Sequence, residues 1–133
     1  MIPKFRAWLK GDKEMVDVDE IAFRTNWIRV FYELNYYWFK FDDVKLMQST
    51  GLFDKNGREI FEGDIVQFED CYTESDFLYI NKGIVEWSQG SFTVTNRDSV
   101  EMEDLLDGEI LDVTIIGNIY ENEALLEVNH DTI

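Results

Sequence analysis

The sequence predicts a mainly β protein whose C-terminal part closes into a small β barrel, and three observations lead to this expectation. Short apolar runs alternate with turn signals through residues 46–133, as the strands of a small barrel do. Asn56-Gly57 and Gly63 allow two tight reversals, because these residues accept a positive φ. Aromatic residues make up 15% of the chain, which favours strands over disorder. Closure would also remove the exposed edges of a short open sheet.

The first 45 residues predict a separate aromatic-rich β segment that packs on this barrel. Ile2–Leu9 alternates imperfectly between apolar and polar residues and is expected to be a strand. Gly11-Asp12-Lys13 is a turn signal, so Glu14–Val18 is expected to return as the second strand of a hairpin. Residues 19–23 either extend that strand or form one helical turn.

The stretch Trp27–Phe41 is the most aromatic part of the chain, and its spacing fits a helical stripe and a strand equally well. Its aromatic and β-branched residues favour strands, with a reversal at Asn35-Tyr36. Eleven of the 20 aromatic residues lie in the first 45 residues, a segment too short to bury them alone. We therefore expect them to pack on the barrel, on another subunit or on both, and we favour both.

The first half of the predicted barrel is set by three interruptions between apolar runs. Thr50-Gly51 breaks the run that begins at Leu46, and Asp54–Gly57 is expected to be a hairpin turn. Glu62-Gly63-Asp64 is a second break, after which Ile65–Phe68 is expected to be a strand. An acidic loop over residues 69–76 follows.

The second half of the barrel is expected to close the sheet. Asn81-Lys82-Gly83 predicts a turn, and Ile84–Trp87 and Phe92–Thr95 then predict a hairpin. Asp98 begins a short helix, and Ile110–Ile116 is expected to be a central strand. The remaining expectations are a bend at Gly117-Asn118 and a last helical turn through Leu126, capped by Asn122.

The net charge of −16 is distributed unevenly along the chain. Residues 1–45 contain eight basic and eight acidic residues, whereas residues 46–133 contain four basic and twenty acidic residues. An acidic surface repels phosphate groups, so this distribution argues against direct binding of DNA or RNA by the second part.

The single cysteine, Cys71, cannot form an internal disulfide, which is typical of a protein in a reducing cytoplasm. No long apolar run follows Met1, so the sequence predicts neither a signal peptide nor a membrane span. We expect a cytoplasmic protein.

Three blocks of the sequence resemble the YopX family, whose members are small proteins encoded by phages and prophages of bacteria. The blocks are KFRAW at Lys4–Trp8, LMQSTGLFDKNGREIFEGDIV at Leu46–Val66 and IIGNIYEN at Ile115–Asn122. Together they span nearly the whole chain. Members of the family often have proline after the Glu-Asn of the last block, where this chain has Glu123.

The resemblance implies an SH3-like barrel in the C-terminal part, so that residues 1–45 and 46–133 form two domains. It also implies a protein that works in the cytoplasm of an infected or lysogenic bacterium. The family has no established activity, so the resemblance implies no catalytic residue, no cofactor-binding residue and no metal ligand.

Two acidic stretches are candidates for a metal site. Asp54–Glu59 superficially resembles a calcium loop, but an EF-hand needs glycine at position six and glutamate at position twelve, where this chain has Gly57 at four and Ile65 at twelve. Carboxylates also cluster between Glu101 and Asp112, yet one run along a helix rarely converges on an ion. A hairpin turn and a solvated face are therefore the favoured interpretations.

Two further side chains would be needed for nucleophilic catalysis. His130 is the only histidine and lies near the end of the chain, where a terminus seldom holds a base in fixed geometry. Cys71 lies among acidic residues, which disfavour its thiolate. The sequence thus predicts no catalytic residue and no cofactor.

The aromatic stretch could stack on nucleic acid bases or sugars, but stacking on a nucleic acid needs basic partners. Without such partners, a core and a contact surface are the favoured interpretation. The residues concerned are Trp27, Phe31, Tyr32, Tyr36, Tyr37, Trp38, Phe39 and Phe41.

These observations favour a non-enzymatic protein-interaction module that binds a host or phage protein through its acidic second part. In a sharper form it would mimic DNA and occupy a nucleic-acid-binding protein, although acidity that only increases solubility is the simpler explanation. A structural homo-oligomer assembled through the aromatic N-terminal segment is the second hypothesis. A metal-dependent enzyme that uses the Glu101–Asp112 carboxylates is the third.

Overall fold

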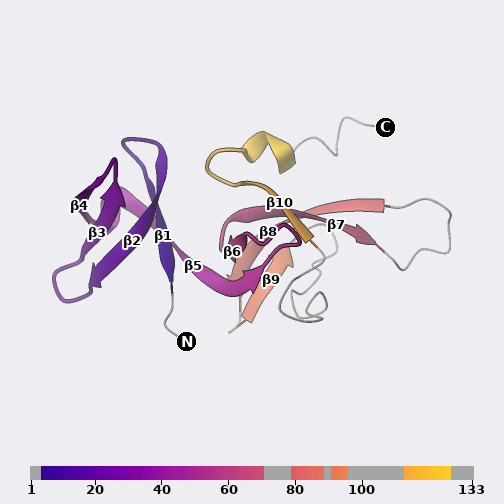
Figure 1. Cartoon of the computed structure of the whole chain (residues 1–133), viewed down its shortest axis with the longest axis horizontal. Helices are drawn as coiled ribbons and strands as arrows, with labels where there is room; N and C mark the ends of the chain where they lie inside the picture. The colour runs from indigo at the N-terminus through magenta and orange to yellow at the C-terminus, as the bar shows by residue number, and fades with distance from the viewer. Residues whose placement is uncertain (1–3, 71–78, 89–90, 96–112, 127–133) are drawn as a thin grey trace. The chain divides into compact units, whose positions relative to one another are not determined.

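The structure is a computed structural model of the 133-residue chain, and it describes residues 4–70, 79–88, 91–95 and 113–126. The described residues are mainly β and form two antiparallel sheets, with only short 3-10 helices (Figure 1). This confirms the predicted class. The chain divides into two compact units, Met1–Ser49 and Thr50–Ile133.

The first unit is an antiparallel sheet built largely from consecutive hairpins. Its strands lie in the order β4-β3-β2-β1-β5, so β1 is paired on one side with β2 and on the other with β5. A 3-10 helix, η1, connects β4 to β5. The elements are β1 (Phe5–Leu9), β2 (Glu14–Ala22), β3 (Trp27–Tyr32), β4 (Asn35–Lys40), η1 (Phe41–Asp43) and β5 (Val44–Phe53), whose last four residues belong to the second unit.

One face of this sheet carries the apolar core of the first unit, because alternate residues of a strand point to the same side. Ile28 and Val30 are fully buried there, whereas Arg29 between them is not. The other buried members are Ala7, Leu9, Val16 and Val44.

The predicted N-terminal strand and hairpin are confirmed over the described residues, and one detail differs from the expectation. Residues 19–22 extend β2, as one of the two alternatives had it. The reversal expected at Asn35-Tyr36 lies two residues earlier, at Glu33 and Leu34, both of which have a positive φ. Burial of Ile28 and Val30 fixes the register of β3, and this register outweighs the preference of asparagine for turns.

The second unit contains the four-stranded antiparallel sheet β10-β7-β8-β9, and β6 pairs with the end of β5. The hairpin formed by Ile84–Trp87 and Phe92–Thr95 and the strand at Ile65–Phe68 are found as predicted. The elements are β6 (Glu59–Phe61), β7 (Asp64–Asp70), β8 (Tyr79–Ser88), β9 (Ser91–Thr95), β10 (Val113–Asn118) and the 3-10 helix η3 (Glu123–Leu126).

The core of the second unit lies between β6 and this sheet. Ile60 of β6 packs with buried side chains from all four strands of the sheet. The buried members besides Ile60 are Val66, Phe68, Val85, Val94 and Val113. The end of β5, through Leu52, and β6, through Ile60, thus pack on one face of the four-stranded sheet.

No closed barrel is found among the described strands, so the expected SH3-like closure is not confirmed. In the described residues β10 and β9 are the two ends of an open strand order. Two expected interruptions are also absent, because Gly51, with φ 78°, lies inside β5 and Asn81-Lys82-Gly83 lies inside β8. At the expected bend of Gly117-Asn118, β10 has a register shift and ends at Asn118.

Asp54 fixes the predicted turn of residues 54–57 to β10. Its carboxylate is fully buried and accepts backbone N–H bonds from Asn56 (3.0 Å), Arg58 (2.8 Å) and Ile115 (3.0 Å). The Arg58 guanidinium also donates to the carbonyl of Ile115. Gly57 has φ 80°, as the turn prediction required. A buried carboxylate with three donors is thereby satisfied without a metal ion.

Asn118 organises the chain after β10 in a similar way. Its Oδ1 accepts the N–H groups of Tyr120 (3.0 Å) and Glu121 (2.9 Å), and its own N–H donates to Oδ1 of Asn122 (3.2 Å). The last helical turn is found as predicted, but Asn122 Oδ1 reaches back to Asn118. A Cβ at Gly117 would lie 2.6 Å from that same Oδ1, so only glycine fits there without displacing it.

Several expectations fall on residues outside the described ranges. These are residues 71–76 of the acidic loop, the helix after Asp98, the first residues of the strand at Ile110–Ile116, Cys71, His130 and the carboxylates of Glu101–Asp112. Among the described residues, no helix has the length and apolar character that crossing a membrane requires.

Candidate interaction surface

The face of β3 and β4 opposite the core is covered with large aromatic side chains. Strand register places Phe31 beside Tyr36, Arg29 beside Trp38 and Trp27 beside Lys40. Since Ile28 and Val30 point into the core, these six side chains point away from it. We call Trp27, Arg29, Phe31, Tyr36, Trp38 and Lys40 the aromatic face.

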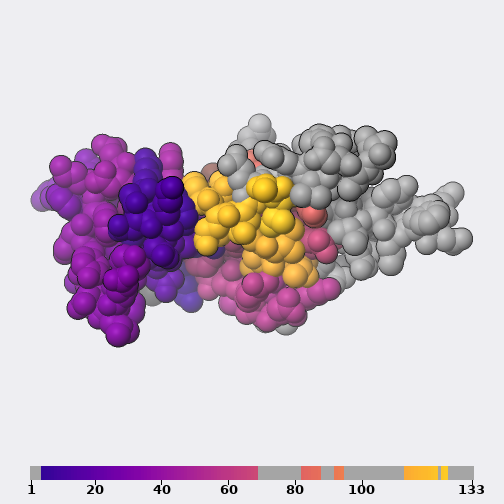
Figure 2. Space-filling model, turned by 90° about the horizontal axis from the view of Figure 1, so that it is seen from above, coloured from indigo at the N-terminus to yellow at the C-terminus, as the bar shows by residue number. Residues whose placement is uncertain are grey.

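The aromatic rings of this face are accessible. Trp27, Phe31, Tyr36 and Trp38 are exposed by 37%, 43%, 58% and 47%. The atoms of β3 and β4 lie at the surface of the first unit (purple in Figure 2). Monomeric soluble proteins rarely expose several large apolar rings side by side, so this cluster of four rings is a candidate contact surface.

The two cations of the face lie over its rings. The Arg29 guanidinium is 5.0 Å from the centre of the Tyr36 ring and 5.8 Å from that of Trp38. The Lys40 ammonium is 5.7 Å from the centre of the Trp27 ring. Phe31 and Tyr36 also touch, with ring centres 5.3 Å apart. These cation–π and ring contacts order the side chains without burying them.

Arg29 is neutralised by acidic side chains of β2. Its Nε donates to Asp19 Oδ2 over 2.7 Å, its guanidinium forms an ion pair with the same carboxylate, and Glu20 lies 3.6 Å away. The hydrogen bond to Asp19 raises the pKa of Arg29 above its ordinary value. Arg29 therefore stiffens the face but adds little net positive charge for a phosphate.

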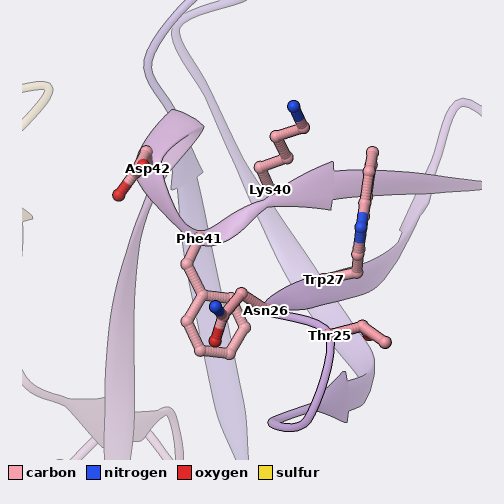
Figure 3. Close-up of a pocket in the computed structure, with 6 residues that line it drawn as sticks. All are labelled: Thr25, Asn26, Trp27, Lys40, Phe41 and Asp42. Carbon is pink, nitrogen blue, oxygen red and sulfur yellow. The ribbon is translucent and has the colours of Figure 1, made fainter.

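A shallow hollow of about 460 Å³ lies at the end of the aromatic face. Trp27 and Lys40 point to the same side of the hairpin, whereas Phe41 points the other way (Figure 3). The lining residues are Thr25, Asn26, Trp27, Lys40, Phe41 and Asp42. On the side of Trp27 and Lys40 the hollow offers one ring and one cation, whereas the Phe41 ring packs against the core of the first unit.

The tip of the β3–β4 hairpin is a strained turn with an exposed apolar residue. Glu33 and Leu34 have φ of 50° and 66°, and Leu34 is 86% exposed. A left-handed conformation costs a residue other than glycine roughly 1–2 kcal/mol, and Asn-Gly would normally occupy such a turn. Leu34 extends the apolar surface of the hairpin beyond the end of the sheet.

The candidate metal sites gain no support from the described residues. The Asp54 carboxylate of the calcium-like stretch is taken up by backbone N–H groups. Within the described ranges, no three His, Cys, Asp or Glu side chains lie close enough to hold a metal ion. Glu101–Asp112, Cys71 and His130 are not described.

Sequence reasoning missed the basic partners of the aromatic stretch. Arg29 and Lys40 lie within Trp27–Phe41, but their contacts with the aromatic rings depend on the strand register that brings each beside a ring of the neighbouring strand. Alternation with buried Ile28 and Val30 was the available signal, because it places Trp27, Arg29 and Phe31 on one side of β3.

Two of three comparisons with known proteins found matches to this chain. The family model described as "YopX protein" matches residues 4–127. The chain is similar to the crystal structure of protein EF1440 from Enterococcus faecalis, with 29% identity, a TM-score of 0.62, and coverage of 95% of this chain and 99% of that one. It is also similar to protein yopX from Bacillus subtilis, with 19% identity, a TM-score of 0.59, and coverage of 92% and 97%. No curated protein matches the chain.

Proposed function

The chain belongs to the YopX family, and from this premise we propose that it is a non-enzymatic protein-interaction module. In this proposal it is encoded by a phage or prophage and acts in the cytoplasm of the bacterial host. Its partner is a protein of the host or of the phage, and it takes no cofactor.

The aromatic face is the observation that carries this proposal. Trp, Tyr, Phe and Arg are the residues enriched at the centres of protein interfaces, and they form the whole of this face except Lys40. The rings are already ordered by contacts with Arg29 and with one another. Ordered rings lose little conformational entropy on docking, which favours affinity.

The acidity of residues 46–133 supports a basic partner. Twenty acidic residues stand against four basic ones in this part of the chain, and such an imbalance speeds association with a protein of opposite charge. DNA mimicry is the sharper form of this proposal. Eleven of the twenty acidic residues lie outside the described ranges, so the proposal rests on total charge and not on the spacing of carboxylates.

Direct stacking on a nucleic acid is disfavoured by the same geometry. The rings have cations beside them, but Asp19 and Glu20 pair with Arg29, and the chain as a whole carries −16. A single-stranded nucleic acid needs a groove of positive charge along its backbone.

Assembly of several copies of the chain is the second candidate function. It is favoured by β4, which is an edge strand among the strands that the structure describes and has five of its six residues exposed. The aromatic N-terminal segment would then serve both as a building contact and as a docking surface.

Affinity capture from a bacterial host lysate tests the first candidate. The immobilised full chain is compared with a Phe31→Ser/Trp38→Ser variant at low and high salt. Trp87→Ser is the matched control, because Trp87 is another exposed tryptophan (51%) but lies on β8 of the second unit. We expect the control and the native chain to capture the same protein and the double variant to lose it.

Salt dependence separates the two forms of the proposal. A basic nucleic-acid-binding partner captured at low salt and released at high salt supports DNA mimicry. Recovery of no basic protein at low salt would end that form. Equal capture by the native chain and the Phe31→Ser/Trp38→Ser variant would remove the aromatic face from the proposed function.

A further inference from the structure

We infer that β4 pairs antiparallel with β4 of a second copy of this chain, with the two Trp38 residues opposite each other on a two-fold axis. This inference rests on the second candidate function and names its interface. The occupant of the β4 edge is thus a second copy and not an unrelated strand.

Strand β4 lacks the features that keep sheet edges from pairing. Proteins protect edges with proline, central charges, bulges or very short strands. β4 has six residues, NYYWFK, with no proline and a single charge at its last position, Lys40. Its ladder with β3 runs through six consecutive pairs without a bulge, and no described strand lies on its other side.

The hairpin turn determines which backbone groups of β4 face outward. A two-residue turn with both φ positive places its flanking pair, Tyr32 and Asn35, in a hydrogen-bonded position. Hydrogen-bonded and non-bonded pairs then alternate along the ladder. The N–H and C=O groups of Tyr36 and Trp38 and the N–H of Lys40 are therefore directed away from β3 and are available to another strand, whereas the Lys40 C=O begins η1.

One register between two copies uses most of these groups. If Trp38 lies opposite Trp38 of the partner, Tyr36 lies opposite the partner's Lys40 at both ends of the ladder. The two Trp38 residues then exchange both of their backbone hydrogen bonds, and each Lys40 N–H donates to the C=O of the partner's Tyr36. A shift of the register by two residues in either direction leaves Tyr36 or Lys40 beyond the end of the opposite strand.

Charge favours the same register. The Lys40 residues of the two copies are four positions apart along the ladder, which is about 13 Å and longer than the Debye length of about 8 Å at physiological salt. Each Lys40 also faces the ring of a Tyr36, an arrangement like that of Lys40 over Trp27 within one copy. Residues 1–45 are neutral overall, so two first units do not repel each other as two acidic second parts would.

The symmetry joins the two aromatic faces. A two-fold axis that relates antiparallel edge strands is perpendicular to the sheet, so both copies present the same face on the same side. Paired copies would form one continuous sheet with two aromatic faces side by side. The contact area of one strand pair is small, so we expect a dissociation constant roughly in the micromolar range.

Sedimentation velocity with the native chain tests self-association. Samples are compared over about two orders of magnitude in concentration around the expected micromolar constant. We expect the mass to rise from that of the monomer to twice that value. A monomer at every concentration would overturn both this inference and the second candidate function, whereas the first candidate function would be unaffected.

Disulfide trapping tests the register. Cys71→Ser provides a background without cysteine. Directly opposite residues of a hydrogen-bonded pair have Cα atoms about 5.5 Å apart, within the range that a disulfide spans. Trp38→Cys in this background should therefore form a covalent dimer on mild oxidation. Tyr36→Cys is the matched control and should remain monomeric, because the two copies of residue 36 would be more than about 13 Å apart.

A second variant guards against unfolding of the hairpin when Trp38 is replaced. Tyr36→Cys combined with Lys40→Cys keeps Trp38 and brings residue 36 opposite the partner's residue 40, so this double variant should also form a covalent dimer. A native chain that dimerises while neither the Trp38→Cys variant nor the double variant crosslinks would overturn the β4 interface and leave assembly through another surface. Crosslinking of Tyr36→Cys as fast as that of Trp38→Cys would overturn the register.

Discussion

Replacement of Asp54 by asparagine should destabilise the second unit by about 3 kcal/mol. Oδ1 of Asp54 accepts the N–H groups of Asn56 and Arg58, whereas Oδ2 accepts the N–H of Ile115. Asparagine keeps one oxygen for the turn but presents an NH2 group to Ile115. A donor would then face a donor at the point where the turn is attached to β10.

The magnitude follows from the burial of the carboxylate. Asp54 is 0% exposed, so water cannot replace the lost acceptor. A hydrogen bond to a charged group contributes about 1.5–3 kcal/mol, and a buried donor left without a partner costs about 1–3 kcal/mol. The Arg58 guanidinium lies 3.6 Å from Oδ2 but is 56% exposed, so solvent screening leaves its ion pair a small contribution. Asp54→Ala, which removes all three bonds, should cost about 4 kcal/mol.

Urea denaturation at neutral pH, together with amide hydrogen exchange of Ile115, measures the effect. We expect a lower midpoint with an unchanged slope, and faster exchange of the Ile115 N–H. Glu59→Gln, on the neighbouring and more exposed β6 side chain, is a control for loss of one negative charge. A loss below about 1 kcal/mol for both Asp54 variants would refute the reasoning that the carboxylate holds the turn on β10.

Three further predictions concern pH, packing and the hairpin tip. Burial by itself raises the pKa of Asp54, but the hydrogen bonds from Ile115, Arg58 and Asn56 outweigh it and lower the pKa below its ordinary value. The stability difference between the native chain and Asp54→Asn should therefore be constant above about pH 4 and shrink as the pH falls through the lowered folded-state pKa, as acid titration of both proteins would show. Gly117→Ala should cost about 2 kcal/mol in urea denaturation, because its Cβ would lie 2.6–2.8 Å from the Asn122 side chain; adding Asn122→Ala should recover part of the loss, and additive effects would contradict the clash. Replacement of Glu33-Leu34 by Asn-Gly should raise thermal stability by about 1 kcal/mol, because it relieves two strained residues; a loss of stability would show that Leu34 packs in the folded protein.

The sequence identified the elements of the fold correctly where a residue typical of turns also lies in a turn of the structure. Gly57 and Gly63 were expected to reverse the chain, and both have the positive φ that such turns need. Gly83 also looked like a turn residue, yet it is buried inside β8 opposite Val66. Nothing in its neighbours distinguishes a glycine that turns the chain from one that lets a neighbouring strand approach closely.

The closed barrel could not be tested by local patterns, because closure is a matter of which strands pair. The sequence predicts the strands β7, β8, β9 and β10. It does not show that β10 pairs with β7 or that β6 pairs with β5. Pairing depends on contacts between distant residues, such as Ile115 with Asp54.

The candidate surface was only half visible in the sequence. The aromatic residues of Trp27–Phe41 suggested a contact surface, but a one-residue change in register would have reversed which of them point outward. Buried Ile28 and Val30 fix that choice, and with it the position of Arg29 between Tyr36 and Trp38.

The bond between Asp54 and Ile115 also bears on the order in which the chain folds during synthesis. The two residues are 61 positions apart, and a ribosome delivers the first of them long before the second. The first unit, whose hairpins join neighbouring segments, can form as soon as β5 has emerged. The Asp54 carboxylate in the 54–57 turn stays solvated until β10 has been translated. Completion of the second unit is therefore the late step of folding.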